Sequence, residues 1–378
     1  MNIDHPLPLL GHLSPRQFMR RHWQRAPLVV RQAIPGFGPL LSRSALVALA
    51  ARDEVESRLI TSGTAKGWTF ARGPFSRSRI PPFKQSQWTL LVQGVDLHDD
   101  AVRELMEQFR FIPDARLDDV MISYATDGGG VGPHFDSYDV FLLQAHGTRR
   151  WRIGRQKDRT LVPGLPVRIL ADFQPEEEYL MEPGDLLYLP PGWAHDGVAM
   201  GNDCMTYSIG FRVPQKGDLA REMLLRMADG AAESLGERLY RDASQPAVEA
   251  PAAIPAALAA FAQQAVHAAL QDEDSLACAL GEYLTEPKAN VWFDAPETLP
   301  ETLGAVRLHR RSRMLYDASH VYLNGESYRA AGVDAELMRV LADARSLPAV
   351  QVRRASKGAR ELLHAWIEEG WLEPMDAA

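Results

Sequence analysis

From about residue 57 to residue 213 the sequence is a succession of short strand-like segments separated by glycine and proline turns. The clearest segments are 88–95, 119–124, 140–144, 149–153, 186–189 and 205–213. Short strands at such regular spacing predict an antiparallel β-sandwich or β-barrel. An N-terminal helix over 14–25, with Ser14 as its cap and Pro15 at its first position, and a strand over 28–30 precede this region.

After Pro214 the pattern becomes helical. Helices are predicted over 218–239, 256–270 and 275–284, with a Pro- and Ala-rich linker over 245–255. These helices have too few apolar residues to form a core of their own, so we expect them to pack on a second copy of the chain as a homodimer. The alternative is that they pack on the barrel of the same chain.

The last part of the chain has a mixed pattern that begins near Pro300. Strands are predicted over 306–316 and 321–323, followed by a turn at Asn324-Gly325 and by helices over 334–344 and 357–369. Small units with this order of elements are often winged helices. The expected domains are therefore 1–213, 214–299 and 300–378, in an α+β chain.

Composition excludes several classes of protein. No segment approaches the ~20 apolar residues that cross a bilayer, and the N-terminus lacks the pattern of a signal peptide. The two cysteines, Cys204 and Cys278, are too few for a disulfide framework. The net charge of −8 argues against nucleic acid as a general partner of the whole chain. We expect a cytoplasmic protein that has no contact with membranes.

Two motifs predict one metal site. His134 and Asp136 follow a glycine-rich run, and because side chains at i and i+2 of a strand point the same way, both can bind one ion. The stretch from Gly184 to His195 reads Gly-x5-Pro-x-Gly-x2-His and supplies a third ligand from a distant strand. Two imidazoles and one carboxylate form the facial triad of non-haem Fe(II) oxygenases. Surface loops or structural histidines account for most isolated His-x-Asp pairs, but the two motifs together favour the metal site.

A basic residue is expected inside the barrel. Arg149 shares its strand face with the apolar residues Trp151 and Ile153, so it should point inward. A buried guanidinium needs an anionic partner, which is either a protein carboxylate such as Asp139 or Glu182, or a substrate carboxylate. Thr206 and Ser208 could present hydroxyl groups to the same interior, although barrels also contain such hydroxyls without a function.

The sequence resembles the JmjC-type cupin oxygenases, and among them the bacterial ribosomal oxygenases. The segments that carry the resemblance are 128–141, 147–154, 182–195 and, more weakly, 22–31. It implies a double-stranded β-helix, the cupin or JmjC jelly roll, followed by a helical dimerisation region and a C-terminal winged-helix-like domain. One departure from the general cupin pattern is that Asp136 stands where a second histidine is usual and the later glutamate is missing, which disfavours a three-histidine cupin.

The resemblance also implies a set of roles. His134, Asp136 and His195 would bind Fe(II), and Arg149 would bind the far carboxylate of the cosubstrate 2-oxoglutarate, with O2 as the oxidant. The implied activity is hydroxylation of an arginine in a large-subunit ribosomal protein. Tyr138 lies on the same face as His134 and Asp136 and either lines the substrate pocket or is a structural aromatic residue.

Other functions fit parts of this pattern. A JmjC demethylase would share every metal ligand, and a different metal cupin would need no 2-oxoglutarate. A regulator that binds DNA through the C-terminal unit would use its arginines, but these fall on a predicted strand, and the helix over 334–344 carries little positive charge.

Overall fold

The structure is a computed structural model that describes residues 2–64, 67–300 and 302–375. The chain divides into two compact units, Met1–Val213 and Pro214–Ala378. Within the described ranges, no helix combines the length and the apolar character that a membrane crossing requires.

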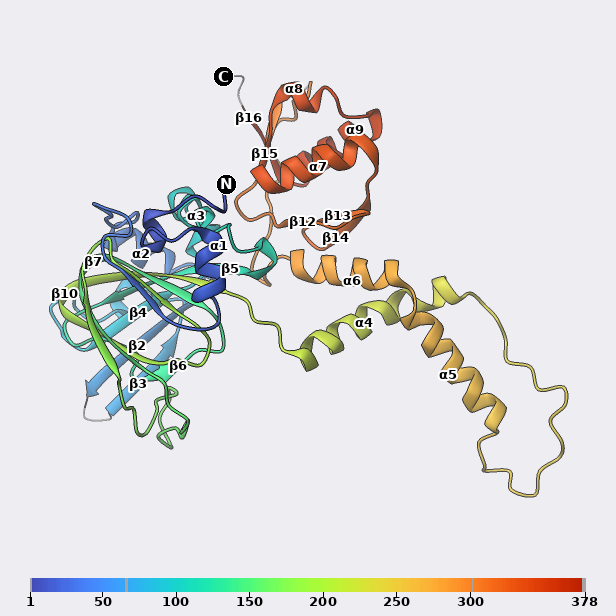
Figure 1. Cartoon of the computed structure of the whole chain (residues 1–378), viewed down its shortest axis with the longest axis horizontal. Helices are drawn as coiled ribbons and strands as arrows, with labels where there is room; N and C mark the ends of the chain where they lie inside the picture. The colour runs from blue at the N-terminus through green and yellow to red at the C-terminus, as the bar shows by residue number, and fades with distance from the viewer. Residues whose placement is uncertain (1, 65–66, 301, 376–378) are drawn as a thin grey trace. The chain divides into compact units, whose positions relative to one another are not determined.

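The first unit is built on one antiparallel sheet of ten strands (Figure 1). Its main path runs β1-β9-β7-β10-β5-β4-β2-β3, while β6 pairs with β10 and β8 pairs with β7. The strands are β1 Leu28–Val30, β2 Ser57–Thr64, β3 Gly67–Arg72, β4 Trp88–Val92, β5 Leu117–Ala125, β6 His134–Phe135, β7 Val140–Gly154, β8 Glu177–Met181, β9 Leu186–Leu189 and β10 Ala194–Phe211. This sheet with its helices confirms the expected JmjC cupin fold.

Alternating side chains give the sheet two buried faces. On β7, Phe141 and Leu143 belong to the large core that also contains residues of the N-terminal helices, whereas Leu142 and Trp151 belong to a smaller apolar cluster. Because side chains alternate along a strand, one strand contributes to both clusters. The smaller cluster lies on the face that carries the predicted ligand His195, which is paired with Ile153 of that cluster.

Two strands are longer than the sequence indicated. The predicted segments 140–144 and 149–153 form the single strand β7, and the predicted 205–213 is only the second half of β10. The paired strands pass through an irregularity instead of a turn: Gly147 has φ 63°, and the register shifts between Met200 and Met205. A β-bulge of this kind takes up extra residues without ending the ladder.

Three helices cover the large-core face of the sheet: α1 Pro15–Arg21, α2 Arg43–Leu49 and α3 Asp100–Glu107. Short 3-10 turns occur at Pro8–Leu10, Arg77–Arg79, Val95–Leu97 and Asp114–Arg116. Helix α1 begins as predicted, since Ser14 accepts a hydrogen bond from the Gln17 backbone and the Gln17 side chain accepts one from the Ser14 backbone. This capping box satisfies two of the donors that a helix start leaves unpaired.

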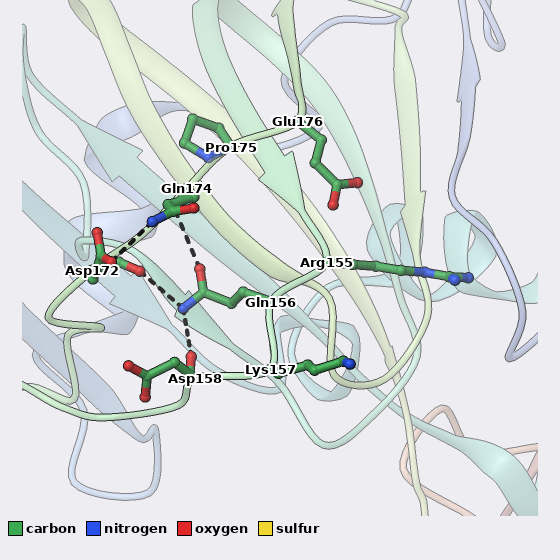
Figure 2. A pocket seen from close by; sticks show the side chains of 8 residues that line it. All are labelled: Arg155, Gln156, Lys157, Asp158, Asp172, Gln174, Pro175 and Glu176. Carbon is green, nitrogen blue, oxygen red and sulfur yellow. Dashed lines mark hydrogen bonds between the residues drawn. The ribbon is translucent and has the colours of Figure 1, made fainter.

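The segment between β7 and β8 forms a polar cavity of about 410 Å³ (Figure 2). Gln156 holds the segment together, because its amide donates to the carbonyl oxygens of Asp158 and Asp172 at 2.6 and 3.2 Å. The Gln174 backbone donates to the same side chain at 3.3 Å. None of the predicted site residues lines this cavity.

The second unit begins with three helices, α4 Lys216–Leu235, α5 Ala256–Leu270 and α6 Glu273–Thr285. A small apolar cluster joins Met223 and Met227 of α4 to Ala279 of α6, whereas α5 has no buried residue. Helix α6 also packs on the sheet β12-β13-β14, where Gly281 leaves room for the ring of Tyr322.

The remaining elements of this unit are strands β11 Ala305–Leu308, β12 Met314–Tyr316, β13 His320–Leu323, β14 Glu326–Arg329, β15 Ser346–Leu347 and β16 Leu372–Met375, with helices α7 Gly332–Ala344, α8 Ala349–Val352 and α9 Lys357–Glu368. They form two three-stranded sheets, β15-β11-β16 and β12-β13-β14. The predicted strand 306–316 is therefore wrong in extent, because β11 and β12 belong to different sheets. The turn at Asn324-Gly325 is confirmed, with φ of 51° and 92°.

Candidate metal centre

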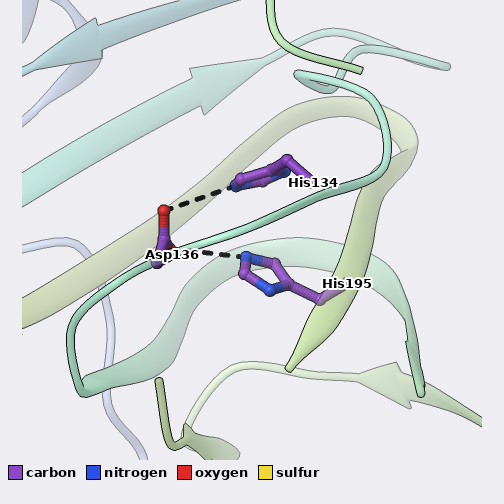
Figure 3. A group of neighbouring side chains, drawn as sticks. All are labelled: His134, Asp136 and His195. Atoms are coloured by element: carbon purple, nitrogen blue, oxygen red, sulfur yellow. Dashed lines mark ion pairs between the residues drawn. The ribbon is translucent and has the colours of Figure 1, made fainter. Parts of the chain in front are cut away.

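His134, Asp136 and His195 come together, with their ligand atoms within 4.8 Å of one another (Figure 3). The carboxylate of Asp136 lies 4.0 Å from Nε2 of His134 and 3.6 Å from Nε2 of His195. β6 contains His134 but ends at Phe135, so Asp136 is the first residue after the strand. β6 pairs with β10 and places His134 directly opposite His195. Donors this close can share one ion with ligand distances of about 2.0–2.2 Å.

Backbone carbonyls fix both imidazoles in one tautomer. Nδ1 of His134 lies 2.8 Å from the Gly132 carbonyl oxygen, and Nδ1 of His195 lies 3.0 Å from that of Trp193. A carbonyl oxygen can only accept, so Nδ1 carries the proton in each ring and the lone pair of Nε2 faces Asp136. Burial, followed by the neighbouring His134, lowers the pKa of His195 to about 4. His195 is therefore a neutral ligand at physiological pH.

The glycine run before His134 is required by close backbone contacts. A Cβ on Gly129 would lie 2.4 Å from the Trp88 carbonyl oxygen, and one on Gly130 would lie 2.6 Å from that of Gly197. Gly132 has φ 80°, a conformation that favours glycine, and its carbonyl binds His134. The run thus brings the His134 segment onto the sheet at a separation that side chains would prevent.

Arg149 is buried and lacks a carboxylate partner in the described part of the chain. Only 5% of its surface is exposed, and its Nε and Nη2 atoms have no hydrogen-bond acceptor there. Asp139, one of the two partners considered from the sequence, instead accepts hydrogen bonds from Tyr188, Gln24 and Arg116. A buried guanidinium without an anion is costly, which is the state expected of a site built for an anionic ligand.

Trp151 lies between Arg149 and the histidine pair. Its ring centroid is 5.6 Å from the Arg149 guanidinium carbon and 5.8 Å from the His195 ring. In the β7–β10 ladder, Arg149 is opposite Ala199 and Ile153 is opposite His195, so Arg149 and His195 share one face. Arg149 and Ile153 are about 13 Å apart along the strand, and a ligand could extend from one end of this face to the other.

Thr206 and Ser208 lie on β10 opposite Gln144 and Leu142. Both are buried, at 1% and 8% exposed, and Leu142 belongs to the Trp151 cluster, so they share the face of the site. The Thr206 hydroxyl donates to the Gln144 side chain at 2.8 Å, whereas no partner of the Ser208 hydroxyl is recorded in the described ranges. Of the two, Ser208 has the hydroxyl that is freer to meet a ligand.

Tyr138 lies beside Asp136. Its residue surface is 39% exposed, yet desolvation of the phenol, followed by the charges of Asp136 and Asp119, raises its pKa well above the usual value. The phenol is therefore protonated and able to donate a hydrogen bond close to the three predicted metal ligands.

The sequence reasoning missed three contributors to this site. The carbonyls of Gly132 and Trp193 orient the histidines, but a backbone acceptor leaves no signal in residue type. Trp151 was treated only as an apolar marker for Arg149; its position between Arg149 and the metal motif could have identified it as part of the wall. Gln144 could not have been found, because its contact with Thr206 depends on the pairing register.

Comparison with known proteins follows the same division of the chain. The JmjC domain family matches residues 104–219, and the ROXA-like winged helix family matches residues 268–373. The solved structure "X-Ray structure of E. coli ycfD" is 30% identical and superposes with a TM-score of 0.82, covering 95% of this chain and 97% of that one. The chain belongs to the JmjC-domain ribosomal oxygenases.

Two further relatives of this ribosomal oxygenase family indicate what its members bind and modify. "Ribosomal protein uL16 3-hydroxylase" of Escherichia coli (strain K12) is 39% identical over 239 residues. That alignment spans 62% of this chain and 61% of the relative. A structure of YcfD from Escherichia coli "in complex with Cobalt and 2-oxoglutarate" is 29% identical, with a TM-score of 0.77 over 95% of this chain and 97% of that one.

Proposed function

We propose that the chain is an Fe(II)- and 2-oxoglutarate-dependent protein hydroxylase. The observation that carries this proposal is one strand face with three clustered metal donors at one end and the unpaired, buried Arg149 at the other. A ferrous ion held by the donors would let O2 oxidise both substrates: one oxygen atom enters a substrate C–H bond, and the other enters 2-oxoglutarate, which becomes succinate and CO2.

Each residue has a defined task in this reaction. His134, Asp136 and His195 hold the metal, and their fixed tautomers keep Nε2 free of a proton without rearrangement. Arg149 binds the far carboxylate of 2-oxoglutarate, preferably through two parallel hydrogen bonds. Trp151 walls the space between them and excludes water.

Three further residues complete the proposed pocket. Thr206 and Ser208 supply the polar part of the 2-oxoglutarate site, with Ser208 donating to the ligand and Thr206 acting through Gln144. Tyr138 lines the entrance for the protein substrate, since its protonated phenol lies beside Asp136 and remains partly exposed.

The protein substrate proposed is an arginine of a large-subunit ribosomal protein. Support comes from the name of the relative that hydroxylates ribosomal protein uL16, and from the net charge of −8, which suits a basic partner. A substrate of this class would place the enzyme in the cytoplasm.

The assembly proposed is a homodimer formed through the region 214–299, followed by a separate winged-helix-like domain over 300–378. Helix α5 supports this proposal, because it has no buried residue and exposes Leu258, Val266 and Leu270 by 40%, 60% and 46%. An apolar helix face without cover is typical of an interface. Replacing Val266 and Leu270 with aspartate should convert a dimer to a monomer in light scattering.

The test of the activity is production of succinate with Fe(II), 2-oxoglutarate and purified ribosomal proteins. The wild type should form succinate and add the mass of one oxygen atom to its substrate, and His134→Ala should do neither. His146→Ala is the matched control, because this exposed histidine lies outside the metal cluster. Loss of a methyl group from the product would instead identify a demethylase. Inactivity with every ribosomal protein, together with retention of duplex DNA, would favour a non-catalytic regulator.

A further inference from the structure

One stretch of the first unit has a charge unlike that of the rest of the chain. Between Glu56 and Asp96 the sequence contains six lysines and arginines and no aspartate or glutamate, although the whole chain has 41 basic and 49 acidic residues. Four of the six are exposed and lie on β3 or in the loop that follows it. We call Arg72, Arg77, Arg79 and Lys84 the basic rim.

The charges of the basic rim are not neutralised within the described structure. None of its four residues forms an ion pair there. The neighbouring Arg43 provides the contrast, because it stacks on the same phenylalanine as Arg77 but is paired with Asp203. The rim is therefore a local positive surface on a protein whose net charge is negative.

Aromatic rings and carbonyl oxygens hold these guanidinium groups in place. Arg77 lies 4.4 Å from the Phe83 ring and donates to the Ile80 carbonyl oxygen, and Arg79 lies 5.4 Å from the Phe75 ring and donates to that of Pro74. Stacking fixes the position of a cation while leaving its charge available. The rim is thus ordered before any ligand arrives, which reduces the entropic cost of binding.

Partly exposed rings lie beside the cations. Phe83 precedes Lys84, and Phe70 lies 6.0 Å from the Arg72 guanidinium carbon on β3; both rings are partly exposed. Cations that meet phosphates, interleaved with rings on which bases can stack, are the pattern of sites for single-stranded nucleic acid. An acidic polypeptide would meet the same cations but would have no use for the rings.

Protection of a sheet edge explains only part of this pattern. β3 is the last strand of the sheet, and edge strands often carry cations that prevent pairing with other chains. That role suits Arg72. It does not account for Arg77, Arg79 and Lys84, which lie beyond the strand, nor for the absence of acids over the whole stretch.

We propose that the basic rim binds the backbone of a single-stranded polynucleotide, separately from the metal centre. The proposal goes beyond protein hydroxylation and does not depend on it. The net charge of −8 disfavours binding elsewhere on the chain, so the interaction should be confined to this surface.

The test is fluorescence anisotropy of the full-length, metal-loaded protein with labelled 20-nucleotide oligouridylate, oligothymidylate and a 20-base-pair duplex. We expect the single strands to bind more tightly than the duplex, and comparison of the two single strands tells an RNA partner from a DNA partner. With four phosphate contacts, affinity should fall about fifty-fold between 50 and 200 mM salt. Stronger binding of labelled polyglutamate than of any oligonucleotide would overturn the proposal in favour of an acidic protein partner.

Charge reversal locates the surface. Arg77→Glu/Arg79→Glu/Lys84→Glu should abolish binding, and the milder Arg77→Gln/Arg79→Gln/Lys84→Gln should weaken it at least ten-fold while preserving the fold, as judged by circular dichroism. Arg20→Glu/Arg21→Glu/Arg221→Glu has the same change in charge at other exposed positions and should bind like the wild type. Equal loss in this control, or no loss in the glutamine variant, would refute the assignment to the basic rim.

Discussion

The indole ring of Trp151 lies 5.8 Å from the imidazole of His195, centroid to centroid, with the planes inclined at 51°. Gly197, opposite Trp151 in the β7–β10 ladder, makes this approach feasible, since a Cβ there would lie 2.5 Å from the indole. A residue two positions after a proposed metal ligand therefore determines where the wall of the site can stand.

Gly197→Ala should displace Trp151 and loosen His195. We expect metal affinity to fall about ten- to a hundred-fold, as for loss of a group that orients a ligand, and the free energy of unfolding to fall by about 1–3 kcal/mol from overpacking. Titration with Co(II) and urea unfolding measure the two effects. Gly217→Ala is the control, because no atom lies within 4 Å of the added Cβ. Unchanged metal affinity in Gly197→Ala would show that Trp151 does not position His195.

Arg149→Met should separate stability from binding. Without its ligand the buried guanidinium is uncompensated, so the apolar side chain should raise the free energy of unfolding by about 1–4 kcal/mol. The dissociation constant of 2-oxoglutarate should rise at least thirty-fold, from loss of about 2–5 kcal/mol of charge-pair energy. Urea unfolding of the metal-free protein and calorimetric titration with 2-oxoglutarate give the two values.

Arg150→Met is the matched control for Arg149→Met, because the adjacent residue points to the other face of β7. It should leave 2-oxoglutarate binding unchanged. If Arg149→Met weakened binding of iron and of 2-oxoglutarate equally, its role as a carboxylate clamp would have to be abandoned.

The sequence could place the donors of this site because local geometry decides them. The i, i+2 spacing of His134 and Asp136 and the inward parity of Arg149 need only the period of a strand. What could not be foreseen depends on contacts between distant segments. Asp139 was as plausible a partner for Arg149 as any acid, and only the fold shows that Tyr188, Gln24 and Arg116 surround it.

Strand boundaries failed for a related reason. Gly147 and the residues near Gly201 look like turns, yet β7 and β10 continue through them because each strand keeps its partner across the irregularity. Likewise, helix α6 was grouped with a dimerisation region from its sequence pattern, although it also packs on the β12-β13-β14 sheet. Pairing across the sheet and packing between elements thus override local turn signals.

Asp139 is predicted to be a structural anchor of the first unit. It is fully buried and accepts hydrogen bonds from Tyr188 at 2.6 Å, Gln24 at 3.0 Å and Arg116 at 3.3 Å. Asp139→Ala should lower the free energy of unfolding by about 3–5 kcal/mol, because it leaves a charge and two polar groups without their partner. Asp118→Ala, at the exposed pair with Arg212, should cost less than about 1 kcal/mol. Equal costs in urea unfolding would contradict the anchor role.

Stability of the metal-free protein should depend on His195 between pH 6.5 and pH 4. The folded state holds the pKa of this buried ring at about 4, against 6.5 for the model value of an exposed histidine. As pH falls through this window the unfolded chain takes up a proton and the folded chain does not, so the free energy of unfolding decreases. His195→Gln lacks this proton, and the stability of the wild type relative to the variant should therefore decline from pH 6.5 to pH 4.

The comparison above pH 7 serves as the internal control for this prediction. There the ring is neutral in both states, so the difference in unfolding free energy between wild type and His195→Gln should be independent of pH. Urea unfolding at half-unit intervals from pH 4 to pH 8, with chelator present, measures the whole curve. A difference that stays constant down to pH 4 would mean that the folded protein binds the proton as readily as the unfolded chain, and that the ring is not held neutral for a metal ion.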